Sequence, residues 1–99
     1  MKECILILVA RPTLEESLVD WLLERPDIGS FTSMPISGHN TDPNELSVHE
    51  QVSGRQRQVM FNIRLSEEKL QTIITDLCEN FRDTCLEYWA LPVLASGRA

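Results

Sequence analysis

The segment Cys4–Ala10 (CILILVA) constrains the fold of this chain most strongly, because it is almost continuously apolar. Such runs are typical of a central β-strand that is covered on both faces. A second strand is predicted at Val59–Leu65, where the residues alternate in character. The alternation places one set of side chains in the core and the other set on the opposite face. The two sets are Val59, Phe61, Ile63 and Leu65, and Met60, Asn62 and Arg64.

Two helices are predicted from apolar residues at helical spacing. The first begins at Thr13, which has the spacing of a capping box with Glu16. The second begins after Ser66, an expected N-cap, and the acidic residues Glu67 and Glu68 suit the positive end of its dipole. The expected buried faces comprise Leu14, Leu18, Trp21 and Leu22 in the first helix, and Leu70, Ile73, Ile74, Leu77 and Phe81 in the second.

The remaining strands complete a β-α-β-β-α-β order. Ser30–Ser37 is the second strand, and Pro35 marks it as an edge or a bulge. Cys85–Val93 is the fourth. This order predicts an α+β, ferredoxin-like sandwich, with a four-stranded antiparallel sheet and two helices on one face. Right-handed crossovers place the first and third strands side by side at its centre. With 99 residues, the chain is expected to form one domain, 1–99.

The face of the sheet that the helices leave open is expected to be partly apolar. It would carry Met60, Asn62 and Arg64 and half of the first strand. The fourth strand would add one of two sets, and its alternation does not decide between them. Either set leaves a sizeable apolar area, which usually marks an interface, so we expect a homo-oligomer joined through the sheet faces. The two sets are Leu86, Tyr88 and Ala90, or Glu87, Trp89 and Leu91.

A polar segment at about 40–58 separates the second and third strands, where a short hairpin would be enough. Long loops are uncommon in compact domains and are often functional. Its candidate metal ligands are His39, His49 and Glu50, since imidazole with carboxylate suits divalent transition metals. Its candidate anion ligands are Arg55 and Arg57, since guanidinium groups bind phosphate well. A solvated loop, whose charges contact water or a neighbouring subunit, is the plainer interpretation of both sets.

Other function classes are not expected. The net charge of −6 argues against nucleic acid and anionic membranes as partners, and no apolar run is long enough to span a membrane. The thiols of Cys4, Cys78 and Cys85 have no metal-site spacing; we expect them to be inert and buried, as suits a cytoplasmic protein. No Ser-His-Asp or paired-carboxylate spacing stands out, so we do not expect an enzyme.

Over nearly its whole length, the chain resembles the PII-like superfamily, which includes the PII signalling proteins and CutA. The strand Gly29–Gly38 and the pair Glu45-Leu46 are similar to the segments that flank the PII T-loop. The ending Glu87–Val93 (EYWALPV) looks like the last core strand of CutA. The run His49–Arg55 (HEQVSGR) most resembles a small proteobacterial branch that is often encoded beside heavy-metal efflux systems.

This resemblance implies a compact homotrimer with its sheets packed inward, ligand clefts between subunits at the loop bases, and a flexible loop that contacts a partner. Gly38 matches the glycine at which PII backbone approaches a nucleotide. The branch motif adds Glu50, Gln51, Gly54 and Arg55 as ligand-binding candidates. The glycine-rich phosphate loop of PII proteins is replaced here by Arg82-Asp83-Thr84, so ATP binding of the PII kind is not expected.

The expected function is therefore that of a cytoplasmic PII-like sensor or regulator, in which the 40–58 loop orders on binding an effector and then contacts a partner. A divalent metal ion is the leading effector. A heavy-metal efflux system in the membrane is the leading partner, which the resemblance alone implies. Two alternatives stay open: a CutA-like metal-binding or tolerance protein without a partner, and a sensor of a small anion or nucleotide that uses Arg55 and Arg57.

Overall fold

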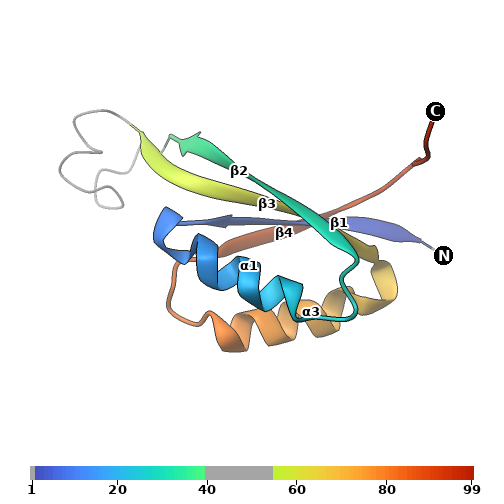
Figure 1. The fold of residues 1–99 in the computed structure, drawn as a ribbon, viewed down its shortest axis with the longest axis horizontal. Coiled ribbons are helices and arrows are strands. Elements are labelled where there is room, and N and C mark those ends of the chain that lie inside the picture. Colours follow the sequence, from blue (N-terminus) through green and yellow to red (C-terminus); the bar gives the residue numbers. More distant parts are fainter. Residues whose placement is uncertain (1, 40–54) are drawn as a thin grey trace.

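The computed structural model describes residues 2–39 and 55–99. Its elements follow the predicted order of strands and helices, with one added turn of 3₁₀ helix (Figure 1). They are β1 (Glu3–Ala10), η1 (Pro12–Leu14), α1 (Glu15–Leu23), β2 (Ser30–Gly38), β3 (Gln56–Ser66), α3 (Glu67–Asn80) and β4 (Glu87–Pro92). Among the described residues, no helix is both long enough and apolar enough to cross a membrane.

The four strands form one antiparallel sheet in the order β2-β3-β1-β4, which confirms the predicted fold class and central strands. Leu6 of β1 lies opposite Ile63 of β3 and Ala90 of β4, which fixes the register across the sheet. Pro35 lies in β2, an edge strand, where a residue without an amide donor is tolerated.

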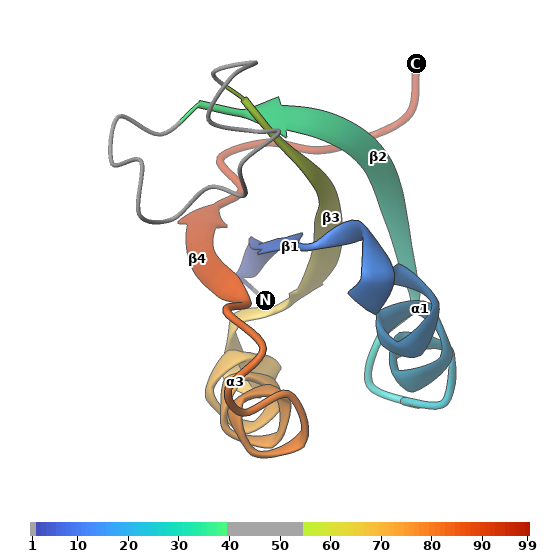
Figure 2. The same ribbon diagram turned by 90° about the vertical axis from the view of Figure 1, so that its left-hand side faces the viewer.

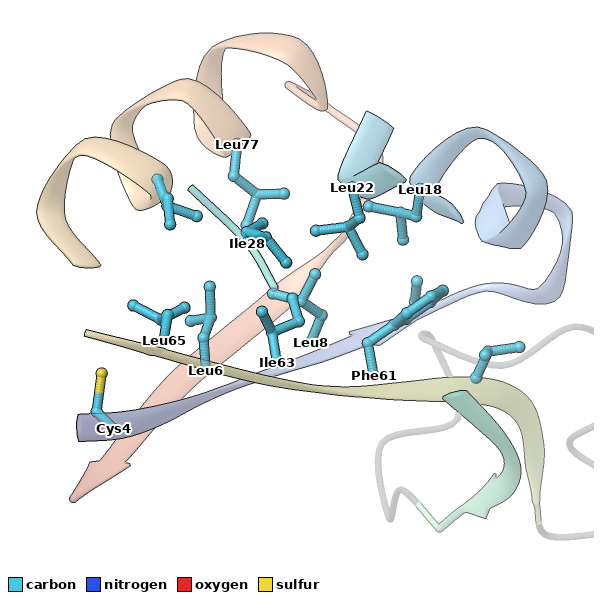
Figure 3. Close-up of a cluster of buried hydrophobic side chains, with 13 residues drawn as sticks. Cys4, Leu6, Leu8, Leu18, Leu22, Ile28, Phe61, Ile63, Leu65 and Leu77 are labelled. Atoms are coloured by element: carbon cyan, nitrogen blue, oxygen red, sulfur yellow. The ribbon is translucent and has the colours of Figure 1, made fainter. Parts of the chain in front are cut away.

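Helices α1 and α3 cover the same face of this curved sheet (Figure 2). Between the helices and the sheet lies the hydrophobic core, to which β1 and β3 contribute alternate residues (Figure 3). The ring centroids of Trp21 and Phe81 lie 5.7 Å apart, edge to face, and join the two helices. The side chains that are less than 2% exposed are Phe61, Leu6, Leu8, Leu18, Leu22, Ile63, Ile73 and Leu77.

Helix α1 begins later than predicted, and Thr13 is not its N-cap. The amide of Leu14 donates to the carbonyl of Arg11 at 3.0 Å and closes the 3₁₀ turn, and Leu14 itself is the N-cap of α1. Proline has a fixed φ and no amide donor, so it suits the first position of such a turn. Pro12 therefore moves the start of the α-helix past the expected capping box.

Ser66 is the N-cap residue of α3 as predicted, but its hydroxyl does not cap the helix. The Oγ atom is buried and has no hydrogen-bond partner among the described residues. The amide of Glu67 instead donates to the backbone carbonyl of Lys2 at 3.0 Å. The start of α3 is thus tied to the start of the chain by backbone groups.

Two strands begin two or three residues away from their predicted starts. Strand β3 begins at Gln56, so residues 56–58 belong to the sheet and not to the polar insert. Their side chains are polar, and the ladder with β2, rather than hydrophobicity, extends the strand: Gly38 lies opposite Gln56. Strand β4 begins at Glu87, so Cys85 precedes it. The remainder of the insert, residues 40–54, lies outside the described residues.

The register also decides which residues of β4 lie on the open face of the sheet. Trp89 lies opposite Ile7 and Leu91 opposite Ile5, so the open face carries Glu87, Trp89 and Leu91. Trp89 is 41% exposed and Leu91 is 50% exposed. The described chain therefore presents an apolar strip to solvent on the side away from its helices, as predicted.

Candidate functional site at the loop base

The ends of all four strands meet at one end of the sheet, which we call the loop base. Here β2 ends at Gly38 and β3 begins at Gln56, on either side of the segment 40–54. The end of β1 and the start of β4 lie beside them, because Val9 pairs with both Met60 and Glu87 (Figure 1). Antiparallel pairing thus brings residues from distant parts of the sequence to the root of the polar segment.

A cavity of about 510 Å³ lies at the loop base, and we call it the loop-base cavity. Its lining includes a guanidinium group, a carboxylate, two amides and a thiol beside apolar side chains. The strand register brings these groups together, because it places the end of β1 beside the starts of β3 and β4. Such a mixture of fixed polar groups suits a small polar ligand. The lining residues are Val9, Ala10, Arg11, Gln56, Gln58, Cys85, Leu86 and Glu87.

Gly38 allows one of these amides to take its position. A Cβ atom on Gly38 would overlap the side-chain amide of Gln58. The amide therefore occupies the space that any other residue at position 38 would fill. The glycine that leaves β2 has a packing role in this structure, beside the nucleotide contact that the resemblance implies for it.

A second cavity, of about 480 Å³, lies beside the first, and we call it the arginine cavity. Both predicted anion ligands, Arg55 and Arg57, line it. Arg57 lies opposite Ser37 of β2, whose hydroxyl-bearing side chain also lines the cavity. Among the described residues of the lining, Glu15 is the one carboxylate beside two guanidinium groups. The excess of positive charge suits a small anion.

The predicted metal ligands are placed only in part. His39 is exposed and directly follows β2. The other two metal candidates, His49 and Glu50, lie outside the described residues, as do the ligand-binding candidates Gln51 and Gly54. Across residues 2–39 and 55–99, no three His, Cys, Asp or Glu side chains gather in a way that could hold a metal ion.

The thiols differ from the prediction. Cys4 is buried as expected, and burial together with the nearby charge of Glu67 raises the pKa of its thiol, which disfavours the reactive thiolate. Cys78 and Cys85, by contrast, are both exposed. Cys78 lies on the solvent side of α3 and Cys85 lies in the turn before β4, so neither is a core residue. The prediction that the thiols are buried was wrong for these two.

Sequence reasoning missed most of the lining of the loop-base cavity. Arg11, Gln58 and Glu87 lie on three different strand ends and share no motif. The signal that could have found them is the strand register, since it places Val9 opposite Glu87. A register cannot be assigned with confidence from one sequence when the flanking turn is undefined.

The family described as "Protein of unknown function (DUF3240)" matches residues 1–99, and the chain belongs to it. A solved DUF3240 family protein from Shewanella baltica OS155 is 20% identical to it. That likeness has a TM-score of 0.80 and covers 100% of this chain and 98% of the other. No protein with a curated description matches this sequence significantly.

Two further solved structures extend the likeness. CPII from Thiomonas intermedia K12, a nitrogen regulatory PII-like protein bound to ADP, AMP and bicarbonate, is 14% identical. Its TM-score is 0.72, over 100% of this chain and 98% of that one. CutA from Synechococcus elongatus PCC7942 is 15% identical, with a TM-score of 0.73, over 96% and 80%. The fold is therefore that of the PII-like superfamily, as the sequence predicted.

Proposed function

We propose that this member of the DUF3240 family is a non-enzymatic PII-like regulatory protein. In this proposal, a homotrimer binds a small effector at the loop base, and the 40–58 loop answers by contacting or releasing a protein partner. One observation carries the proposal: both cavities at the loop base are lined by residues close to the ends of the segment 40–54, Gln56 in the first and Ser37 and Arg55 in the second. A ligand held there would act on the ends of that segment.

The coupling has a simple physical basis. Arg55 is the first described residue after the segment, and Ser37 lies three positions before it. An effector can shift a conformational equilibrium only by its difference in affinity for the two states. A ligand that contacts Arg55 and Ser37 together binds best when the two ends of the segment are held in one arrangement. Binding would then select that arrangement of the loop.

The arginine cavity favours an anionic effector, such as a phosphate ester or bicarbonate. Arg55 and Arg57 contribute two guanidinium groups to one cavity, and a guanidinium binds oxyanions through two parallel hydrogen bonds. The PII-like CPII, whose fold is similar, was solved bound to ADP, AMP and bicarbonate. That likeness supports the class of ligand by analogy and does not assign one.

A divalent metal ion is the second candidate effector. The exposed imidazole of His39 lies at the loop base, and His49 with Glu50 would complete the ligand set from the loop. A CutA-like metal-binding protein without a partner would use the same residues. A heavy-metal efflux system is the partner that we propose for the regulatory form, and a cytoplasmic location goes with it.

A native mass spectrum tests the assembly and the effector together. The protein would be purified without chelator and measured before and after adding Zn²⁺, Cu²⁺, ADP or bicarbonate. We expect a trimer that takes up one anionic ligand per chain. Arg55→Ala and Arg57→Ala should each lose that ligand, whereas Arg98→Ala, an exposed arginine in the C-terminal tail, should retain it. A trimer that takes up metal, and loses it in His39→Ala, would support the second candidate instead.

The regulatory and CutA-like forms differ in the partner. A pull-down with the wild-type chain, with and without ligand, should recover a partner in a ligand-dependent way if the protein is a regulator. Stoichiometric metal binding with no recovered partner would favour the CutA-like form. A monomer in the native spectrum would remove the basis of the whole proposal.

A further inference from the structure

Two exposed thiols lie on either side of the turn that connects α3 to β4. Cys78 is near the C-terminal end of α3, and Cys85 lies two residues before β4 begins. Figure 2 shows how this connection turns from the helix back to the edge of the sheet. The seven-residue spacing alone indicates no site, since it matches no metal motif. The observation that matters is how the turn places the two residues.

Both cysteines line one cavity of about 190 Å³ between the end of α3 and strand β4. Beside the two cysteines, the cavity is lined by four apolar or aromatic side chains and by three polar ones: Leu77, Phe81, Leu86 and Tyr88, and Arg82, Asp83 and Thr84. Hard cations prefer water oxygens to a thiolate ligand, so a thiolate binds them weakly. It binds soft, polarisable ions well, because sulfur donates electron density readily. The cavity therefore presents two soft donors in a setting that suits soft ions.

The turn between the cysteines has a defined geometry. Asp83 and Cys85 both have φ of 62°, a left-handed conformation that costs an ordinary residue about 1 kcal/mol or more. The hydroxyl of Thr84 donates to the carbonyl of Phe81 at 2.6 Å and holds the turn against the helix end. Cys85 is thus presented to the cavity by a fixed backbone and not by a loose segment.

We propose that Cys78 and Cys85 form a two-thiolate site for a soft monovalent metal ion of the Cu(I) class. Two S–H bonds break, two S–Cu bonds form, and two protons pass to solvent, so a Cu⁺ ion and two neutral thiols give an anionic bis-thiolate complex. Cu(I) accepts two-coordinate, near-linear thiolate ligation. The site shares Cys85 and Leu86 with the lining of the loop-base cavity, but it binds its ion through thiolates and does not need the arginine cavity of Arg55 and Arg57.

The ligand set discriminates among metals. Zinc takes four ligands in structural sites, and no group of three or more His, Cys, Asp or Glu gathers anywhere in the described parts of the chain. Two thiolates alone satisfy Cu(I) but leave Zn²⁺ short of ligands. Cys4 takes no part, because it is buried and pairs with Pro92, at the far end of β4 from Cys85.

The test is an anaerobic titration of the full chain with Cu(I) against a chromogenic Cu(I) chelator, with native mass spectrometry for the stoichiometry. The wild type and Cys4→Ala, which keeps both exposed thiols, should each bind one Cu(I) per chain. Cys78→Ser and Cys85→Ser should each lose the ion completely, and the double variant should behave like either single one. The wild-type affinity should fall as pH falls, because binding releases two protons.

Two outcomes would overturn the site. Retention of one tightly bound Cu(I) by Cys78→Ser or Cys85→Ser would show that the thiols act separately, and loss of binding in Cys4→Ala would move the site elsewhere. If Cys85→Ser fails to fold, Cys85→Asn is the substitute, since asparagine tolerates a positive φ and offers no thiolate. Arg55→Ala should leave the Cu(I) titration unchanged, so failure of this site and failure of the loop-base proposal are distinguishable.

Discussion

At the loop base, the side-chain amide of Gln58 fills the space where a Cβ on Gly38 would lie. Gln58 lines both the loop-base cavity and the arginine cavity, so its amide lies between the two candidate ligand sites. The side chain at position 38 therefore controls the position of a group at the centre of the proposed effector site.

We expect Gly38→Ala to destabilise the protein when residue 58 is glutamine and to stabilise it when residue 58 is alanine. Alanine in a strand lowers the entropy of the unfolded chain, which stabilises a protein by about 0.4–1 kcal/mol when no clash arises. With Gln58 present, the methyl group displaces the amide and we expect a small net loss of stability. In the Gln58→Ala background we expect a gain. A double-mutant cycle from urea unfolding measures this coupling.

The absence of any coupling between the two positions would show that the amide of Gln58 does not occupy that space in solution. Ser33→Ala is a matched control, because it is another exposed position of β2 that lies opposite Phe61 rather than Gln58. It should show no dependence on residue 58.

Ser66→Ala should cost far less than the loss of a usual N-cap. Replacing a capping serine typically destabilises a protein by about 1 kcal/mol. Here the Oγ atom is buried without a hydrogen-bond partner among the described residues, and the amide of Glu67 is satisfied by the carbonyl of Lys2. Removing an unsatisfied buried hydroxyl is close to neutral or stabilising. A thermal melt that showed the full capping loss would contradict this arrangement.

The sequence predicted those features of the fold that leave a periodic pattern of apolar residues. The alternation of Phe61 and Ile63 and the apolar run of β1 identified the core strands, because a sheet with one covered face imposes that pattern. The topology followed from the order of the elements. The ends of helices and strands were less predictable. The turn at Pro12 delays the start of α1, and the polar residue Gln56 begins β3; both boundaries depend on backbone hydrogen bonds, which a pattern of apolar residues does not reveal.

The candidate site shows the same division. Arg55 and Arg57 could be singled out as residue types, and both line one cavity. Glu87 and Gln58 could not, because only the register brings them together. The exposure of Cys78 was missed since it follows the buried Leu77 on a helix, and one residue along a helix changes the face by about 100°.

Arg25→Ala should destabilise the protein by about 1.5–3 kcal/mol, the range for hydrogen bonds that involve charged groups. The guanidinium of Arg25 donates to Asp27 and to Asp76 of α3, both at 2.9 Å, and its carbon lies 4.9 Å from the ring centroid of Trp21. Arg25→Lys keeps the charge but not the planar fork, so it should recover only part of the loss. Full recovery by lysine in urea unfolding would show that charge alone matters. Arg98→Ala is the exposed control.

The same contact makes stability depend on pH in the acid range. The hydrogen bond from Arg25 lowers the pKa of Asp27 below its ordinary value of 3.8. A carboxylate with a lowered pKa in the folded state stabilises the protein above its unfolded pKa, and this stability is lost as pH falls through the folded value. Asp27→Asn should therefore weaken the dependence of stability on pH below about 4. Arg25→Ala, which removes the hydrogen-bond donor, should weaken this dependence in the same way.

Trp89→Glu tests whether the open face of the sheet holds the assembly together. Trp89 and Leu91 are 41% and 50% exposed and lie opposite Ile7 and Ile5, and Met34, which is 43% exposed, lies opposite Met60 on the same face. In a trimer packed through this face, these side chains would be buried, and an unpaired carboxylate there would cost several kcal/mol. The variant should sediment as a monomer at concentrations where the wild type is a trimer, with its helix and strand content unchanged.

Leu23→Glu provides the matched control, because Leu23 is 69% exposed but lies on α1, in the helix layer on the other side of the sheet. It should remain a trimer. Dissociation by both variants would indicate a general loss of stability, whereas a trimer that survives Trp89→Glu would place the interface away from the open face.

The position of the interface also matters for the effector site. Val9 and Glu87 lie on the open face at the loop base, so packing through that face would bring a neighbouring subunit over the loop-base cavity. Loss of the trimer in Trp89→Glu should then weaken binding at that cavity, even though Trp89 does not line it.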